Sequence, residues 1–316
     1  MHTLSLHDGT TLPAFGLGTW LSEPEMVYRA VREAISIGYR HIDAAWIYFN
    51  EEEVGRGIRE AIAAGDVTRE ALWVTTKLWN DMHAPGDVQT GLENSLKQLG
   101  LDYVDLYLMH WPVAHPKGVV RPASGAEFLS LEQQPLESTW EAMVKLPATG
   151  KAKHVGVSNF SLSKIDRIIE AVGAQPAANQ IELHPYNAQT DLVAGLKQRN
   201  ILATAYSPLG SSGRPDTMKR DDETRLLDNA ALADIAAAHD CSPAQALIAW
   251  GLARGTAVIP KSTNPARIAQ NLDATKVQLT DAEVATLTAL DRGERYVTGA
   301  FWCPPGSPYT LESLWG

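Results

Sequence analysis

The chain has 316 residues, 45% of them hydrophobic and 20% charged, with a formal net charge of −10 at pH 7. This composition predicts a soluble globular protein and argues against nucleic acid as a partner, because phosphate binding needs a concentrated Lys/Arg surface. Two cysteines, Cys241 and Cys303, are too few for a disulfide framework. The polar N-terminus and the lack of a long apolar run predict neither a signal peptide nor a membrane helix, so we expect a cytoplasmic protein.

The first predicted element is a β-hairpin in LSLHDGTTLPAF, where Asp8 and Gly9 would supply the positive φ angles of a tight turn. Short apolar segments then recur along the chain, separated by longer segments of mixed polarity. These short segments are the predicted strands, at residues 15–19, 41–44, 73–78, 104–110, 154–158, 179–183, 202–207 and 257–260.

The segments between the strands have helical periodicity. In residues 51–65 and 161–172 the apolar side chains recur every three or four positions and so share one face. Two further helix starts are marked by capping boxes, Ser242 with Gln245 and Thr280 with Glu283. The repeated alternation of strand and helix predicts a parallel sheet closed as a (β/α)8 TIM barrel, and therefore a single domain spanning 1–316.

Three long stretches interrupt this alternation, at residues 112–134, 207–228 and 292–316. Long loops in compact domains are usually functional or disordered. The last stretch contains five aromatic residues, which is unusual for a disordered tail. We therefore expect the loops and this C-terminal tail, 292–316, to lie over the C-terminal face of the barrel and to pack over a substrate pocket.

Polar residues end three neighbouring strands of the predicted barrel. Asp43 ends the second strand with Tyr48 on the loop after it, Lys77 ends the third, and His110 the fourth. Each alone has an ordinary explanation, such as a turn cap, a packing residue, a solvent-facing lysine or a hydrogen-bonded core histidine. Because chemistry in such barrels occurs at the carboxyl ends of the strands, the four side chains together predict an active site.

These residue types suit proton transfer to an oxygen. Tyr48 would be the general acid, and the charge of Lys77 would lower its pKa from about 10 by one or two units. Asp43 would keep Lys77 charged and in position. His110 would orient a substrate oxygen near the phenol.

Seven motifs, in order along the chain, resemble the aldo-keto reductases. The resemblance runs from about Pro13 to Asp291, and it implies a TIM barrel that binds NADP(H) without a Rossmann fold. It also implies a tetrad of Asp43, Tyr48, Lys77 and His110, in which Tyr48 is the acid or base, and hence reduction of aldehydes and ketones to alcohols. The motifs are HIDAAWIYFNEEEVG, LWVTTKLW, LDYVDLYLMHWP, VGVSNF, NQIELHPY, AYSPLGS and IPKSTNPARIAQN.

The resemblance also implies a cofactor site, with NADP(H) preferred and NAD(H) possible. The segment IPKSTNPARIAQN combines a strand end, a helix start and two cations, which suits the adenosine 2′-phosphate. Tyr206 would stack on the nicotinamide ring. The expected cofactor-binding residues are Ser158, Asn159, Gln180, Tyr206, Ser207, Leu209, Ser211, Lys261, Ser262, Thr263, Arg267, Gln270 and Asn271.

The substrate is expected to be a small carbonyl compound with an apolar body, bound by a monomeric protein. The resemblance implies a pocket lined by Trp20, Ile47, Trp79, Trp111 and Trp302, with Phe128 and Phe301 from the long loops as possible additions. Trp46 departs from the smaller or polar residue often found there in the family, and the tail after Asp291 matches it poorly.

Three alternatives differ in chemistry. A metal-dependent hydrolase could use His41, Asp43, His110 and His184, although no metal-binding spacing is present and we expect no metal. An aldolase could use Lys77 as a Schiff-base nucleophile. A non-catalytic or regulatory barrel subunit could bind NADPH without turning over a substrate.

Overall fold

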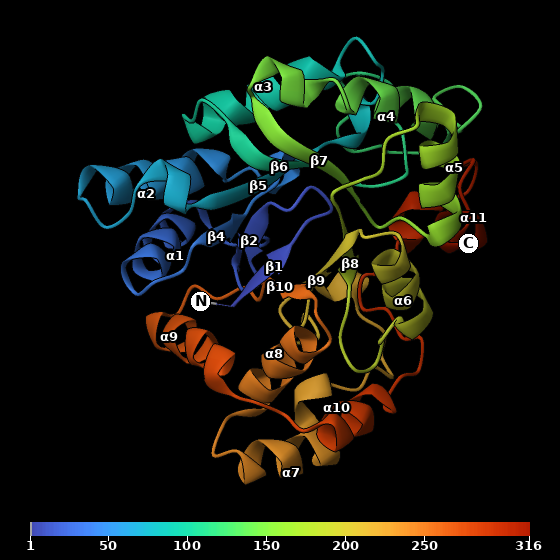
Figure 1. The fold of residues 1–316 in the computed structure, drawn as a ribbon. Helices are drawn as coiled ribbons and strands as arrows, with labels where there is room; N and C mark the ends of the chain where they lie inside the picture. The colour runs from blue at the N-terminus through green and yellow to red at the C-terminus, as the bar shows by residue number, and fades with distance from the viewer. Residues whose placement is uncertain (1) are drawn as a thin grey trace.

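The computed structural model describes residues 2–316 and has eight parallel strands at its centre (Figure 1). Hydrogen bonds from Gly16 N to Val258 O (3.0 Å) and from Gly18 N to Pro260 O (3.1 Å) join the first strand to the last, so the sheet closes. The predicted TIM barrel is confirmed. In order around the barrel the strands are β3 (Leu17–Gly18), β4 (His41–Asp43), β5 (Trp73–Leu78), β6 (Val104–Met109), β7 (Ala152–Ser158), β8 (Ala178–Glu182), β9 (Leu202–Tyr206) and β10 (Ala257–Val258).

Helices surround the strands on the outside (Figure 1). None of those in residues 2–316 is long and apolar enough to cross a membrane. The α-helices are α1 (Pro24–Ser36), α2 (Glu51–Ala63), α3 (Val88–Leu99), α4 (Leu136–Met143), α5 (Leu162–Val172), α6 (Thr190–Gln198), α7 (Ala230–Ala238), α8 (Pro243–Ala253), α9 (Pro265–Asp273), α10 (Asp281–Thr288) and α11 (Leu311–Trp315).

The helix signals in the sequence agree with the structure. Helix α2 turns Val54, Ile58 and Ala61 into the core, as its periodicity predicts. Both capping boxes are present, at the starts of α8 and α10. Each box satisfies main-chain N–H groups that a helix leaves without a partner in its first turn, which fixes where the helix begins.

The N-terminal hairpin closes one end of the barrel. Its strands β1 (Thr3–Ser5) and β2 (Thr11–Pro13) are antiparallel, and Leu6 and Leu12 pack with buried side chains from the starts of the barrel strands. The turn differs from the prediction, because only Gly9 has a positive φ, of 86°. The loop runs from Leu6 to Thr10, and a turn followed by one left-handed glycine is enough to reverse it. The side chain of Asp8 instead accepts a hydrogen bond from Thr10 N, at 2.9 Å.

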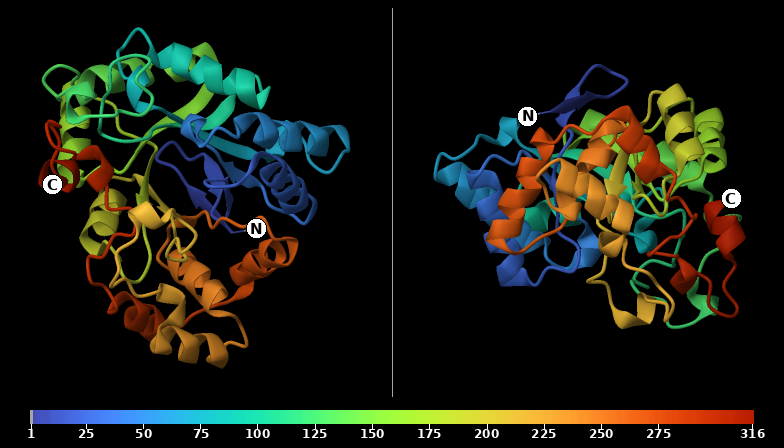
Figure 2. Two further views of the ribbon diagram at one scale, coloured as in Figure 1. Left: turned by 180° about the vertical axis from the view of Figure 1, so that it is seen from behind. Right: turned by 90° about the horizontal axis from the view of Figure 1, so that it is seen from below.

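The long segments gather at the opposite end of the barrel. In the right-hand view of Figure 2 the hairpin lies at one end, and segment 207–228 extends from the other. The tail contains a short 3-10 helix, η9 (Ala300–Trp302), before α11. Tyr296 and Trp302 in the tail are buried, so it packs against the barrel as predicted. The carboxyl ends of the strands therefore face a space enclosed by loops and tail.

Candidate active site

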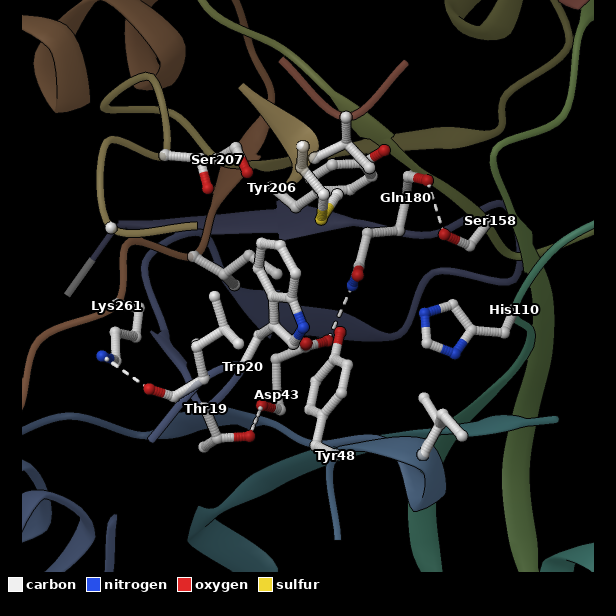
Figure 3. Close-up of a pocket in the computed structure, with 18 of the residues that line it drawn as sticks. Thr19, Trp20, Asp43, Tyr48, His110, Ser158, Gln180, Tyr206, Ser207 and Lys261 are labelled. Carbon is white, nitrogen blue, oxygen red and sulfur yellow. Dashed lines mark hydrogen bonds between the residues drawn. The ribbon is translucent and has the colours of Figure 1, made fainter. Parts of the chain in front are cut away.

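A cavity of about 750 Å³ opens at the carboxyl ends of the strands. Asp43, Tyr48 and His110 line it and face the same space (Figure 3). Lys77 lies directly behind Asp43 and does not line the cavity. The structure thus brings together the four residues that the strand ends predict.

Local structure fixes each of these side chains. Asp43 is the last residue of β4, and Tyr48 ends the short helix η1 (Trp46–Tyr48), after which Phe49 adopts a left-handed conformation with φ of 54°. Lys77 lies in β5, which pairs with β4 on one side and β6 on the other. His110 follows β6, and its main-chain N donates to Leu78 O at 3.2 Å.

Asp43 and Lys77 form a buried ion pair. Lys77 Nζ donates to Asp43 Oδ1 at 2.6 Å and to Ala44 O at 2.8 Å. The other carboxylate oxygen of Asp43 accepts from Gln180 Nε2 at 2.7 Å. Burial lowers the pKa of Lys77, while the charge of Asp43 opposes this shift. Asp43 therefore holds the lysine in place through a charge-assisted hydrogen bond.

Tyr48 corrects one expectation from the sequence. Burial, followed by the charge of Asp43, raises the pKa of Tyr48 well above 10, so the predicted lowering by Lys77 is wrong. The ammonium group lies 5.2 Å from the centre of the Tyr48 ring, and its charge is balanced by the closer carboxylate of Asp43. Tyr48 is therefore a neutral phenol that can donate its proton.

His110 is neutral as well. Burial, with the charge of Lys77 as the next cause, lowers its pKa well below 6.5. The centres of the His110 and Tyr48 rings are 5.8 Å apart, in an edge-on arrangement. A phenol and a neutral imidazole thus face one space, where both can hydrogen-bond to an oxygen atom.

The wall beside His110 consists of the residues expected to hold the nicotinamide. Ser158, Asn159, Gln180 and Tyr206 all line the cavity. They are joined by hydrogen bonds from Ser158 Oγ to Gln180 O (2.8 Å) and from Tyr206 Oη to Asn159 Oδ1 (2.7 Å). Asn159 Nδ2 also donates to His110 O at 3.0 Å, which ties this wall to the tetrad.

The far end of the cavity carries two cations without counter-ions. Lys261 and Arg267 line it beside the start of α9, and neither forms an ion pair with any other residue of the described chain, 2–316. Burial and the charge of Arg267 lower the pKa of Lys261, and the charge of Glu23 opposes this shift without forming an ion pair. Asn264 caps α9 by accepting from Arg267 N at 3.1 Å. This end therefore fits a phosphate group.

The remaining cofactor predictions divide into two groups. Five further expected residues line the cavity, whereas Gln270 and Asn271 lie on α9 outside its lining. Gln270 is exposed and Asn271 is buried, so their contact with adenine stays a prediction. The five that line the cavity are Ser207, Leu209, Ser211, Ser262 and Thr263.

Aromatic side chains form the other half of the cavity. Trp302 packs against Trp79 and Trp111, with ring centres 5.7 and 5.6 Å apart. Phe301 also lines the cavity, whereas Phe128 lies behind Trp302 and is only 7% exposed. The structure thus brings all five predicted pocket residues to the cavity, namely Trp20, Ile47, Trp79, Trp111 and Trp302.

The sequence did not single out several further residues of this half, among them Val120, Arg121 and Pro122. They lie in the long stretch 112–134, whose length predicted a functional loop without indicating which residues would reach the cavity. Among these three residues, only the basic side chain of Arg121 could have suggested a place in a binding site.

The geometry disfavours two of the alternatives. His41 Nδ1 is hydrogen-bonded to Pro13 O at 3.2 Å, and His184 Nε2 is hydrogen-bonded to Glu182 Oε1 at 2.8 Å. Neither histidine lines the cavity with Asp43 and His110. Within residues 2–316 there is no cluster of three or more His, Cys, Asp or Glu that could hold a metal ion. The fully buried amine of Lys77 has no access to a substrate in the cavity.

Comparison with known proteins agrees with this geometry. Residues 14–292 match the sequence model of the Aldo/keto reductase family. The chain is 49% identical to "Aldo/keto reductase slr0942" of Synechocystis sp. over 315 residues, 100% of this chain and 96% of that protein. It is 43% identical to "Aldo-keto reductase family 1 member A1" of Gallus gallus over 297 residues (93% and 90%). The human protein of the same name is 42% identical over 294 residues (92% and 90%). The chain therefore belongs to the aldo/keto reductase family, whose members are NAD(P)H-dependent oxidoreductases that act on carbonyl groups.

Proposed function

We propose that this enzyme uses NADPH to reduce aldehydes and ketones to alcohols, with Tyr48 as the general acid. The observation that carries the proposal is the neutral phenol of Tyr48 beside the neutral imidazole of His110 in one cavity. A bound nicotinamide cofactor would supply the hydride that the carbonyl carbon receives.

The residues of the chain then have separate tasks. His110 orients the carbonyl oxygen, and Tyr48 donates its proton to that oxygen as negative charge develops on it. Lys77 and Asp43 form a buried ion pair behind the site, in which Asp43 holds Lys77 in position. In the oxidation of an alcohol, Tyr48 would take the proton back.

Residues on two sides of the cavity would bind the cofactor. Ser158, Asn159 and Gln180 line the cavity and would hold the carboxamide, and Tyr206 would stack on the ring. The cavity end with Lys261 and Arg267 would hold the 2′-phosphate, because a dianion there would balance two unpaired cations. This is the reason to propose NADPH over NADH.

Titration with each cofactor tests that preference. Replacing Arg267 with Ala should weaken NADPH binding roughly tenfold to a hundredfold, which corresponds to one charge-assisted contact, and should weaken NADH binding much less. Arg29→Ala on α1 is a matched control, because it removes an exposed arginine outside the cavity. Equal losses for the two cofactors in Arg267→Ala would contradict the phosphate assignment.

Turnover distinguishes the enzyme from a cofactor-binding subunit. Aldehydes, ketones and sugars would be assayed for NADPH oxidation, with NADH in parallel. Rapid reduction of a simple aromatic aldehyde supports the proposal, whereas tight NADPH binding without turnover favours the subunit. The single domain 1–316, the role of tail 292–316 in the substrate pocket, the monomeric state and the cytoplasmic location stay predictions.

A further inference from the structure

We propose that Glu182 is a positioning residue that sets the size of the substrate accepted by the cavity. Its buried carboxylate fixes the turn at which the C-terminal tail crosses from the cofactor wall to the aromatic half. The inference rests on the proposed function, since it concerns the choice of substrate in the same cavity. Glu182 ends β8 and does not line the cavity, so it acts through the tail.

The carboxylate of Glu182 binds two main-chain N–H groups of the tail. Its Oε1 accepts from Tyr296 N at 2.6 Å, and its Oε2 accepts from Val297 N at 2.8 Å. Oε1 is also hydrogen-bonded to His184 Nε2 at 2.8 Å. Glu182 is 2% exposed, and no Lys or Arg within residues 2–316 forms an ion pair with it. Because a buried carboxylate without a cation is costly, it depends on these N–H donors, and they in turn are held by it.

Glu182 is also part of the cofactor wall. It pairs in register with Tyr206 of β9, the residue proposed to stack on the nicotinamide. The main-chain oxygen of Glu182 accepts from Asn187 Nδ2 at 3.0 Å, and Asn187 Oδ1 accepts from Arg295 Nη1 at 3.2 Å. The tail turn 295–297 is therefore tied to the end of β8 through both the side chain and the main chain of Glu182.

Val297 connects this turn to the substrate half of the cavity. Its side chain lines the cavity and belongs to the same apolar cluster as Trp79, Trp111 and Trp302. Because the N–H group of Val297 is bound by Glu182, the carboxylate fixes the position of this part of the wall. A bulky substrate would fill the aromatic half and contact the wall, whereas a small aldehyde would contact it much less.

Glu182→Gln isolates this role, because the two side chains have nearly the same shape. An amide has only one acceptor oxygen, so in either orientation its NH2 group faces the N–H group of Tyr296 or that of Val297. His184 can adapt to both orientations, since a neutral imidazole donates or accepts at Nε2 according to its tautomer. The lost hydrogen bond therefore belongs to the tail turn.

Reduction of a small and a bulky aromatic aldehyde, benzaldehyde and 2-naphthaldehyde, tests the inference. We expect Glu182→Gln to lower the bulky-to-small ratio of kcat/KM about tenfold, the size of one hydrogen bond to a charged group. The change should come mainly from a higher KM for the bulky aldehyde. A role in stability alone would lower the resistance to urea and leave this ratio unchanged.

Two further variants complete the experiment. Arg295→Met loosens the same turn but keeps the carboxylate, so it should lower the ratio in the same direction and by less. Glu137→Gln is the matched control, because it removes a carboxylate that pairs with Arg167 away from the cavity. This control should keep the wild-type ratio.

Each outcome bears on one of the two proposals. An unchanged ratio in Glu182→Gln would overturn the inference, while reduction of benzaldehyde upheld the proposed function. If Glu182→Gln does not fold, Arg295→Met decides in its place, and an unchanged ratio there would overturn the inference equally. Failure of the wild type to reduce either aldehyde would refute the proposed function itself.

Discussion

The hydroxyl group of Tyr309 joins the C-terminal tail to the loop over residues 112–134. Ala114 and Leu129 form an antiparallel pair in which Leu129 N donates to Ala114 O at 2.9 Å. The second hydrogen bond of that pair passes through Tyr309, which accepts from Ala114 N at 2.9 Å and donates to Leu129 O at 2.7 Å. We therefore predict that Tyr309→Phe weakens the contact between tail and loop.

The size of the effect follows from this geometry. Phenylalanine keeps the ring, which packs on Phe128 at 6.0 Å between ring centres, so the variant removes only the hydroxyl. It leaves one N–H and one C=O without a partner at a site where Tyr309 is 5% exposed. At about 1 to 2 kcal/mol for each group, the free energy of unfolding should fall by roughly 2 to 4 kcal/mol.

The tail and the loop could also separate locally without unfolding of the whole chain. In that case the lost hydrogen bonds should weaken substrate binding. Phe128 lies behind Trp302, so the KM of a bulky aromatic aldehyde should rise more than that of a small one. Affinity for NADPH should stay unchanged, because the phosphate-binding end is formed by other segments.

Urea unfolding and steady-state kinetics would measure both effects. Tyr28→Phe is a suitable control, since its hydroxyl donates to the exposed carboxylate of Glu60 and its loss leaves no buried group without a partner. If Tyr309→Phe matched Tyr28→Phe in both stability and KM, the bridging role of the hydroxyl would be refuted.

Two further substitutions test the packing around the barrel. Burial raises the pKa of Glu51 from 4.5 to about 7, so the folded chain keeps a proton that the unfolded chain releases, and stability falls as the pH rises through this range. Glu51→Gln removes this dependence. In urea unfolding, the free energy of unfolding of the variant relative to that of the wild type should rise by roughly 3 kcal/mol between pH 4.5 and pH 8. A constant difference between the two proteins over this range would contradict the reasoning. Gly55→Ala should destabilise the fold by roughly 2 to 4 kcal/mol, because its Cβ would lie 1.9 Å from Leu99 O. Gly86→Ala serves as the control, because a Cβ at that position would have no neighbouring atom within 4 Å. Equal melting temperatures of the two variants would refute the clash.

The sequence predicted the barrel and the positions of the tetrad because both depend on short-range patterns. Strand segments and helix starts are local, and the parallel register of β4, β5 and β6 then brings Asp43, Lys77 and His110 together. The residues predicted to bind the cofactor follow later strands of the same alternation of strand and helix. Their approximate order around the barrel was therefore predictable as well.

Features that depend on long-range packing were not predictable. Tyr309 meets Ala114 across 195 positions of the chain, and nothing in the local sequence of either residue indicates the contact. The pKa of Tyr48 was misjudged because the sequence shows its charged neighbours but not how far the fold removes the phenol from water. The sequence also could not place Phe128 behind Trp302, because this contact joins the loop over residues 112–134 to the C-terminal tail and depends on how the two segments pack on each other.

The central claim is that Tyr48 delivers the proton, and Tyr48→Phe tests it most directly. The variant would be assayed for NADPH affinity and for single-turnover reduction of an aromatic aldehyde that the wild type reduces. We predict that NADPH affinity is retained while the rate falls by roughly a hundredfold to ten-thousandfold, the usual contribution of a general acid. Reduction at the wild-type rate by Tyr48→Phe would contradict the account.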